Sequence, residues 1–334
     1  MKKKVFCFLT GLIAISPALR AQDPHFSQYY KSPQTLNPAM TGYFNGDYRF
    51  IGNYRQQWMA VGDPYITASV GFDTKLMRKK QVNDVFALGV NGLYDKSLNG
   101  GLKSTFVSGS LAYTKALDQK NKFGLGFQFT YATRFIYMDK LTFATQFNGT
   151  GFDPNLPSME NAGVQEQGYF DVNTGLLYVH SAPKTEVYVG VSAYHINQPR
   201  VGFFENEKYR LRPRYTINAG SRFSLGGGKS KLYLSGLFME QGGATEENIG
   251  IVYGASANES VTVLGGIWYR VNDAVIPYIG MQANNFQIDL SYDVNNSSLK
   301  NYRSKNGSFE LSITITGKKA TSAGAGNQQD GRIY

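Results

Sequence analysis

The sequence predicts an all-β outer-membrane protein, a barrel of about 14 antiparallel strands with an N-terminal plug. Fourteen segments between Asp47 and Gly317 alternate apolar residues with small or polar ones at a period of two, which indicates strands with one oily and one wet face. They run about 10 to 12 residues, the length that a tilted strand needs to cross a bilayer, whereas strands of soluble proteins average about 5 to 6. The 37 glycines, 23 tyrosines and 22 phenylalanines are typical of crowded barrel walls and aromatic girdles.

Residues 1–21 are typical of an export signal. Three lysines precede an apolar run from Val5 to Leu19, and Ala21 stands before Gln22; such a segment is removed after export and does not span the membrane. Its removal takes away four basic residues and Cys7, the single cysteine, and lowers the formal net charge from +10 to +6. The mature chain therefore has no disulfide or thiolate metal site, and it offers no basic groove for nucleic acid.

Residues 22–45 do not resemble a strand, because they include three prolines and lack alternation. Their aromatic content is too high for a free linker, and a 14-stranded wall encloses space that something must fill. Asn37-Pro38-Ala39 ahead of Gly42 is typical of a single capped helical turn. We therefore expect a plug in the lumen, with an ordered periplasmic arm as the alternative. The predicted plug residues are Phe26, Tyr29, Tyr30, Asn37, Pro38 and Ala39.

The barrel is expected over residues 46–317, and a flexible periplasmic tail over residues 318–334. The predicted strands are 47–58, 64–75, 84–95, 103–115, 122–135, 168–179, 185–196, 213–224, 230–240, 246–255, 261–270, 274–283, 285–295 and 307–317. Their number is even, as in bacterial single-chain barrels. Pro277 makes the strand at 274–283 the weakest of these predictions, because proline cannot donate to the ladder.

The connections between these strands predict the orientation of the barrel. The three longest, 136–167, 197–213 and 296–306, all follow odd-numbered strands, whereas the connections after even-numbered strands are short. Outer-membrane barrels carry long loops outside and short turns in the periplasm. We therefore expect the three long connections on the cell surface.

Three inward-facing residues of the first strand, Arg49, Asn53 and Arg55, make the predicted lumen polar. They could bind a plug or a substrate chain. Because buried charges need partners, we expect a hydrogen-bond network with the N-terminal segment.

The outer connection 136–167 is the longest irregular stretch, and loops of more than about 15 residues are usually functional. Its aromatic residues Phe143, Phe147 and Phe152 could fold inward as a lid or form a contact surface for a secreted partner, and we favour the contact surface. Arg210 and Arg212 lie in the neighbouring connection. These arginines either form a solvated rim without a specific role or belong to the same contact surface for the secreted partner.

A second basic cluster, Arg78, Lys79 and Lys80, falls in the turn after the second strand. It is either a solvated rim that pairs with lipid phosphates or a site where a periplasmic partner docks. Rim charges mainly steer association, so docking is the functional hypothesis for this cluster.

His195 is the single residue that calls for a catalytic test. A lipid-deacylating barrel would need a histidine, a serine and an acid close together. On a strand that runs to residue 196, His195 shares the outward parity of Val191, whereas Ser192 faces inward, so the two cannot be partners. A serine on a neighbouring strand stays open as a partner, but we expect no catalytic site, and three scattered histidines predict neither a metal nor a cofactor site.

Several motifs, taken in order, resemble one known family. The chain contains Gln22-Asp-Pro-His-Phe-Ser-Gln-Tyr29, Leu36-Asn-Pro-Ala-Met-Thr-Gly42, Tyr54-Arg-Gln-Gln-Trp58 and Tyr188-Val-Gly-Val-Ser-Ala-Tyr-His-Ile-Asn-Gln-Pro199. They resemble the PorP/SprF family of type IX secretion system membrane proteins across essentially the whole mature chain. The resemblance implies an outer-membrane barrel of Bacteroidota-type cells that serves type IX export, gliding adhesins and the retention of secreted proteins at the surface. The polar tail after residue 317 departs from the usual aromatic end of a barrel.

Three functional classes follow from these observations. The first is a non-enzymatic component of type IX protein secretion and surface anchoring, with a secreted surface protein or adhesin as its partner and periplasmic secretion components as further partners. The second is a transporter of hydrophobic small molecules like the FadL family, whose plug carries an Asn-Pro-Ala motif comparable to residues 37–39; it would need an apolar pocket and a lateral opening. An enzyme such as a lipase is the third and weakest.

Overall fold

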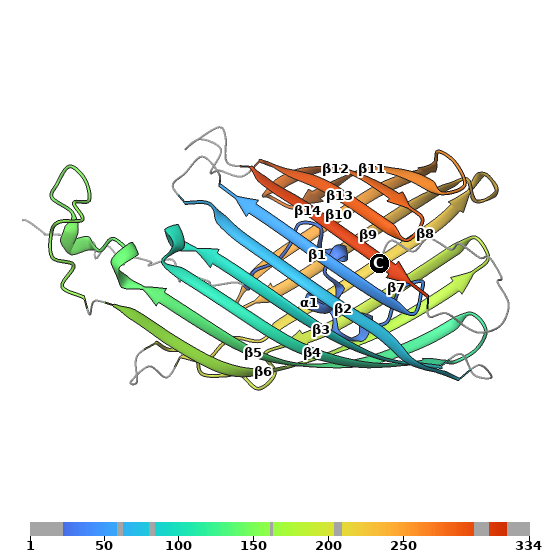
Figure 1. Ribbon diagram of the computed structural model, residues 1–334, viewed down its shortest axis with the longest axis horizontal. Helices are drawn as coiled ribbons and strands as arrows, with labels where there is room; N and C mark the ends of the chain where they lie inside the picture. The colour runs from blue at the N-terminus through green and yellow to red at the C-terminus, as the bar shows by residue number, and fades with distance from the viewer. Residues whose placement is uncertain are drawn as a thin grey trace, which may run out of the picture.

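The computed structural model describes residues 23–58, 63–79, 84–160, 163–203, 209–296 and 307–318. These residues form a closed antiparallel barrel of 14 strands, in which each strand pairs with the next and β14 pairs with β1 (Figure 1). The predicted fold class and strand count are confirmed. The strands are β1 Tyr48–Gln57, β2 Tyr65–Lys79, β3 Asp84–Ser97, β4 Leu102–Ala116, β5 Asn121–Tyr137, β6 Val164–Ala182, β7 Thr185–Tyr194, β8 Arg214–Leu225, β9 Ser230–Gln241, β10 Ala244–Ser256, β11 Val261–Arg270, β12 Ala274–Ala283, β13 Phe286–Asn295 and β14 Ser308–Gly317.

The wall has the two faces that the alternation predicts. Along β5, Phe127 is 37% exposed on the outer surface, whereas the next residue, Gln128, is 3% exposed and points inward. The same alternation of exposed apolar and buried residues continues through β6 and β7. A bilayer solvates the apolar side of each strand, while the polar side faces the lumen.

Pro277 lies inside β12 and interrupts the pairing of this strand with β13. The pairing of β12 with β11 is continuous, but the register with β13 runs from Ala274 to Val275 and resumes at Tyr278. A proline has no N–H to donate, so one side of the strand loses its pairing at this point while the other keeps it. The strand predicted at 274–283 is nevertheless present with the predicted bounds.

The two ends of the barrel differ in their connections. One end, called here the loop end, carries the long connections after β5, β7 and β13; the other, the turn end, carries the short ones. The connection after β5 includes the short helices η4 (Met138–Lys140) and η5 (Ala144–Gln146), and it projects far beyond the other strands (Figure 1). Two further short helices, η3 (Leu98–Gly100) and η6 (Gly226–Gly228), join strands at the loop end and the turn end respectively.

Residues 23–45 lie inside the barrel, where Figure 1 shows α1 enclosed by the wall. Three very short helices form this N-terminal segment: η1 (Tyr29–Lys31), α1 (Pro33–Leu36) and η2 (Pro38–Met40). Asp23 contacts residues at the loop end, and Phe44 contacts Lys75 near the turn end. The segment therefore runs the length of the lumen before the chain enters β1. No helix of the described residues is long and apolar enough to cross a membrane.

The predicted export signal, residues 1–21, and Gln22 lie outside the described residues, as does all of the predicted tail beyond Lys318.

Candidate functional site

The turn Asn37-Pro38-Ala39 is held against the inner wall by its own cap. The Oδ1 atom of Asn37 accepts a hydrogen bond from the Ala39 amide at 2.9 Å, which is the usual role of an N-cap asparagine. The Nδ2 atom of Asn37 donates to the carbonyls of Leu176 and Val191 at 3.0 and 3.3 Å. One side chain thus both closes the turn and ties it to paired residues of β6 and β7.

Three glycines of the wall leave room for this turn. A Cβ atom at Gly126 would collide with the backbone of Pro38, and one at Gly175 or Gly190 would collide with the Asn37 side chain. At Gly126 two backbones approach too closely for any side chain, and at Gly175 and Gly190 the Asn37 amide occupies the space that a side chain would need. Gly126 and Gly175 are direct partners across β5 and β6, so the sheet register assembles the hollow.

Arg49 fixes the end of the N-terminal segment nearest the turn end. This side chain is fully buried and makes a paired contact with Asp73, with Nε and Nη2 at 2.9 and 2.8 Å from the two carboxylate oxygens. Asp73 also accepts a hydrogen bond from the Gly42 amide at 2.7 Å, and Lys75 donates to the Phe44 carbonyl at 2.6 Å. Two cations and a carboxylate of the wall therefore bond directly to the backbone of the segment.

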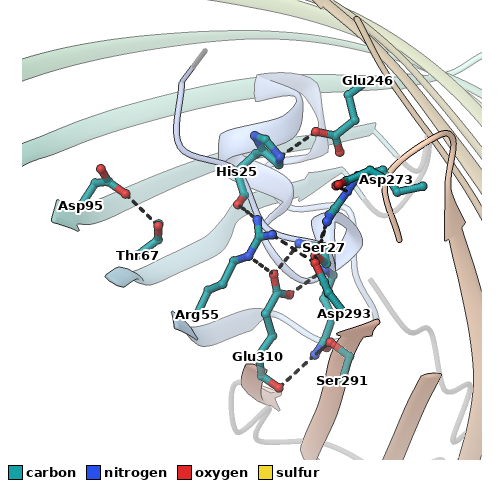
Figure 2. A network of polar contacts seen from close by, with 12 residues as sticks. His25, Ser27, Arg55, Thr67, Asp95, Glu246, Asp273, Ser291, Asp293 and Glu310 are labelled. Atoms are coloured by element: carbon teal, nitrogen blue, oxygen red, sulfur yellow. Dashed lines mark hydrogen bonds and ion pairs between the residues drawn. The ribbon is translucent and has the colours of Figure 1, made fainter. Parts of the chain in front are cut away.

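Arg55 is the centre of a second network, shown in Figure 2. Its guanidinium donates to the His25 carbonyl at 2.7 Å and to Asp293 at 3.1 Å, and it lies 3.2 Å from Glu310. Asp293 also accepts from Arg270 at 2.6 Å. Three strands, β1, β11 and β13, thus share one buried charge cluster, and β14 adds the carboxylate of Glu310.

The backbone of the N-terminal segment completes this cluster. Glu310 accepts hydrogen bonds from the amides of Ser27 and Gln28, and the Ser27 hydroxyl donates to Asp293 at 2.7 Å (Figure 2). Hydrogen bonds to ionised groups are about twice as strong as neutral ones. The segment is therefore a partner in the ion network and not merely enclosed by it.

Asn53 and Lys31 form a third link. Asn53 Nδ2 donates to the Lys31 carbonyl at 3.0 Å, and Lys31 Nζ lies 3.0 Å from the Asp289 carboxylate, with both charged groups fully buried. All three lumen residues predicted from the sequence, Arg49, Asn53 and Arg55, thus bond to the N-terminal segment in the structure.

Two of the predicted aromatic residues of the segment, Tyr29 and Tyr30, pack in one cluster with aromatic residues of the wall. Tyr30 stacks on Trp268 with ring centroids 4.5 Å apart, and Tyr29 meets the same indole edge-on at 5.6 Å. Tyr278 lies edge-on to Tyr30, and Phe26 is also buried. Such pairs add to the free energy of burial, so apolar packing and ion pairs act on the same segment.

At the loop end, His195 lies between two carboxylates. Its Nδ1 is 2.9 Å from Asp171 and its Nε2 is 2.6 Å from Asp23, which also lies 3.2 Å from Arg214. Burial alone would lower the pKa of His195, but the charges of Asp23 and Asp171 outweigh it and raise this pKa to about 9. Burial alone would raise the pKa of Asp23, but His195 and Arg214 outweigh it and lower that pKa well below its usual range.

The outward orientation predicted for His195 is wrong. Strand β7 ends at Tyr194, and His195 has a φ of 58°, so the backbone turns there and the parity of the strand no longer applies. The ring is 4% exposed and faces the lumen. Ser192, on the inward face of β7, donates its hydroxyl to the Leu36 carbonyl at 2.8 Å.

The outer connections contain exposed and covered parts. Phe147 and Phe152 are 51% and 56% exposed and contact each other edge-on at 5.4 Å, while Phe143 is half-buried. Arg210 and Arg212 are exposed on the neighbouring connection, where Arg210 donates to the Gln198 carbonyl at 3.1 Å. The structure therefore places these five residues on two neighbouring connections of the loop end.

The predicted periplasmic docking residues are only partly described. Arg78 and Lys79 belong to the end of β2, but their side chains and all of Lys80 lie outside the described residues.

Sequence reasoning missed the acidic partners on the inner wall. Asp73, Asp171, Asp289, Asp293 and Glu310 all occupy inward positions of predicted strands. These acidic residues could have been found from the sequence, because an ionisable residue at an inward-facing position of a predicted strand needs a charged or hydrogen-bonding partner when it is buried. Among the described residues, no three His, Cys, Asp or Glu side chains converge to hold a metal ion.

Comparison with known proteins gives one family match. A family model described as "Type IX secretion system membrane protein PorP/SprF" matches residues 18–315. None of the curated proteins compared with the sequence matches it.

Three of the solved structures that resemble the chain are two transporter-type barrels and a porin, all of low sequence identity. The Ralstonia pickettii toluene transporter TbuX has a TM-score of 0.47 and 12% identity and covers 85% of this chain and 92% of its own. A Pseudomonas aeruginosa FadL homologue has a TM-score of 0.49 and 10% identity, with 85% and 94% covered. The KdgM porin has a TM-score of 0.40 and 6% identity, with 80% and 98% covered.

Proposed function

Because the chain belongs to the PorP/SprF family of type IX secretion system membrane proteins and lies in the outer membrane, we propose that it is a non-enzymatic component that holds a secreted surface protein or gliding adhesin at the cell surface. The proposal places the protein in a Bacteroidota-type cell, exported by the signal over residues 1–21. The loop end is the extracellular end, since long connections of such barrels face outward. The partner contacts the outer connections after β5 and β7.

The observation that carries this proposal is the contrast between a filled lumen and exposed apolar loops. Residues 22–45 act as a plug, which is supported by the hydrogen bonds of Arg55 and Asp73 of the wall with the His25 carbonyl and the Gly42 amide of this segment. A lumen tied in this way favours a binding role over conduction. Exposed aromatic side chains such as Phe147 and Phe152 are typical of binding surfaces, because water solvates them poorly.

The surroundings of His195, the residue considered above as a catalytic candidate, support the non-enzymatic role. Both ring nitrogens of His195 lie within hydrogen-bond distance of a carboxylate. A general base needs a free nitrogen that reaches a nucleophile, and the Ser192 hydroxyl donates to a backbone carbonyl instead. The geometry of His195 favours a structural link between Asp23 and the wall.

The FadL-like alternative has less support. It needs an apolar pocket in the lumen, but an apolar hollow of about 760 Å³ is lined mainly by lipid-facing residues such as Val189, Leu234 and Ile251. The wall around the N-terminal segment carries charged and hydrogen-bonding residues, and its apolar residues, such as Trp268, are already packed against Tyr29 and Tyr30 of the segment. Recovery of a bound fatty acid or hydrocarbon from the purified barrel would favour this alternative.

Affinity purification from outer membranes tests the leading proposal. A tag after Tyr334 is used to recover the barrel in mild detergent, and the proteins that accompany it are identified. We expect a large secreted protein with the native chain and its loss when residues 139–160 are replaced by a short Gly-Ser linker that keeps β5 and β6. A matched control replaces residues 257–260 at the turn end. Equal recovery from all three chains would contradict a role for the loop.

Two further parts of the proposal concern the periplasmic side. Arg78, Lys79 and Lys80 dock periplasmic secretion components, and residues 318–334 extend there as a tail. Crosslinking of the native chain and of a variant with the three basic residues changed to serine tests the docking site: the variant should lose periplasmic partners but keep the secreted one.

A further inference from the structure

Strand β6 is much longer than its neighbour β7 at the loop end. The pairing of β6 with β5 begins at Val164, but its pairing with β7 begins only at Thr174. Ten residues of β6, 164–173, therefore extend beyond Ala193, the last residue of β7 that pairs with β6, and at about 3.3 Å per residue this amounts to about 30 Å. The extension is part of the projecting β5–β6 hairpin in Figure 1.

The backbone groups of this extension point alternately to its two sides. In an antiparallel ladder the N–H and C=O of one residue face the same neighbour, and the next residue faces the other. Val172 faces the β7 side, because its carbonyl accepts from the Ile196 amide at 3.1 Å. By the same alternation, the even-numbered residues Val164, Glu166, Gly168 and Phe170 turn their N–H and C=O away from β5.

The side chain of Asn197 takes the place of one further backbone pair beside β6. The Asn197 amide accepts from the Val172 N–H at 3.1 Å and donates to the Phe170 carbonyl at 2.8 Å, which imitates a paired backbone. Beyond this point the Gly168 carbonyl accepts from the neighbouring Gln167 side chain at 2.9 Å. Among the described residues, no backbone group pairs with this side of residues 164–170.

The described residues of the β7–β8 connection lie beside the inner face of the β6 extension. Arg200 and Arg210 form an isolated antiparallel bridge with each other. Val201 packs on Tyr169 and Ala132, which face the mouth of the lumen, and the Gln167 side chain lies 3.5 Å from the Arg200 carbonyl. None of these described residues forms a backbone pair with the edge of residues 164–170.

The sequence of the edge has little of the usual protection. Proteins block exposed edges with charged residues, especially lysine, with proline, with bulges or with a covering loop, and Glu166 is the single charged residue among residues 164–170. Residues 164–170, Val-Gln-Glu-Gln-Gly-Tyr-Phe, contain neither proline nor lysine, and β5 and β6 pair without a register shift along them. Val164 and Phe170 are 52% and 53% exposed on the outer face, so an added strand would find apolar side chains beside it.

We propose that residues 164–170 of β6 form a docking edge that accepts an extended segment of the secreted partner as an additional β-strand. This proposal rests on the proposed function, because that function supplies the partner outside the cell. A seven-residue edge is long enough for a typical strand of about 5 to 6 residues. The backbone hydrogen bonds give affinity, and Val164, Phe170 and the Tyr169 side of the strand select alternating apolar residues in the partner.

Proline substitution at one edge residue tests the proposal without disturbing the β5 ladder. The N–H of Glu166 faces the open side, so Glu166→Pro removes a donor from the docking edge only and places a ring in the path of an added strand. Glu166→Ala is the matched control, because it removes the charge and keeps the N–H. Heat-modifiable migration on gels shows that both variants form the barrel.

We expect recovery of the secreted protein from outer membranes to fall about tenfold with Glu166→Pro and to change less than about twofold with Glu166→Ala. Amide exchange at Gly168 and Phe170 should slow when the native barrel binds its partner. Equal recovery with Glu166→Pro, or a loss that Glu166→Ala reproduces, overturns the docking edge while leaving the proposed function intact.

Two other outcomes also decide the matter. If the native chain recovers no secreted protein, the proposed function fails and the docking edge fails with it. If a differently tagged copy of this chain is recovered and is lost with Glu166→Pro, the edge belongs to a self-association contact and the proposal is wrong.

Discussion

The N-terminal segment and the loop-end extension of β5 and β6 differ in how much of each is buried and in how many bonds each makes to the rest of the molecule. Residues 23–45 are almost entirely buried and bond to inward residues of many strands, among them β1, β2, β13 and β14. The extension keeps one ladder on β5 and exposes Phe147, Phe152 and one edge of β6. The ion pairs of this molecule therefore stabilise the interior around the N-terminal segment. The exposed extension makes few contacts with the rest of the chain, so local opening there costs little free energy.

The largest expected effect comes from breaking the interior network at Arg55. Arg55→Met removes the cation shared by Asp293 and Glu310 and leaves two buried carboxylates with fewer partners. Breaking a buried pair in this way costs about 3–5 kcal/mol of unfolding free energy. Urea unfolding of the barrel in detergent, followed by tryptophan fluorescence, measures it, since Trp268 lies in the core next to Tyr30.

The matched control for this change lies at the loop end. Arg210→Met removes an exposed arginine, and we expect a shift within about 0.5 kcal/mol. Similar losses of unfolding free energy for Arg55→Met and Arg210→Met would contradict the view that the interior ion network stabilises the barrel more than the exposed loop residues do.

The next effect is a pH dependence at the start of the N-terminal segment. The pKa of His195, about 9, lies above the ordinary value of 6.5 because Asp23 and Asp171 face its ring, with Arg214 beyond Asp23. A raised pKa stabilises the folded state fully below pH 6.5, and this contribution of about 3 kcal/mol is lost as the pH rises towards 9.

Unfolding midpoints between pH 6 and 10 measure this contribution. The native barrel should lose stability over the upper part of that range, whereas His195→Gln should be less stable at pH 6 and nearly flat. A native profile as flat as that of the variant would show that His195 is not charged between its carboxylates.

A smaller effect is expected where the Asn37 turn meets the wall. Gly175→Ala places a methyl group against the Asn37 side chain, and overpacking of this kind costs about 1–3 kcal/mol. Gly109→Ala is the control, because nothing lies within 4 Å of a Cβ at that glycine. If residues 22–45 plug the lumen, Gly175→Ala should also raise conductance in planar bilayers relative to Gly109→Ala.

The smallest effect on stability is expected at the exposed loop. Phe147→Ser should change the unfolding free energy by less than about 0.5 kcal/mol, because the ring is half exposed. The same variant should lower recovery of the secreted protein from outer membranes. A large loss of stability with unchanged recovery would mean that the loop is a structural lid, the alternative interpretation of its aromatic residues.

The sequence by itself determined the wall of the barrel. Alternation at a period of two is a property of the strand backbone, so it located all 14 strands, including β12 with Pro277 at its middle. The same parity assigned Arg49, Asn53 and Arg55 to the inner face, where the structure has them. It failed at His195, because a positive φ at the end of β7 ends the regularity on which parity depends.

Only the tertiary structure decided which charges meet. Ser27 bonds to Glu310 across 283 positions and His195 to Asp23 across 172, and no local pattern relates residues so far apart. Those pairs exist because closure of the barrel, completed by the pairing of β1 with β14, encloses the N-terminal segment in the lumen. The free edge of β6 has the same origin: it depends on where β7 stops pairing, which is a relation between two strands and not a property of either one.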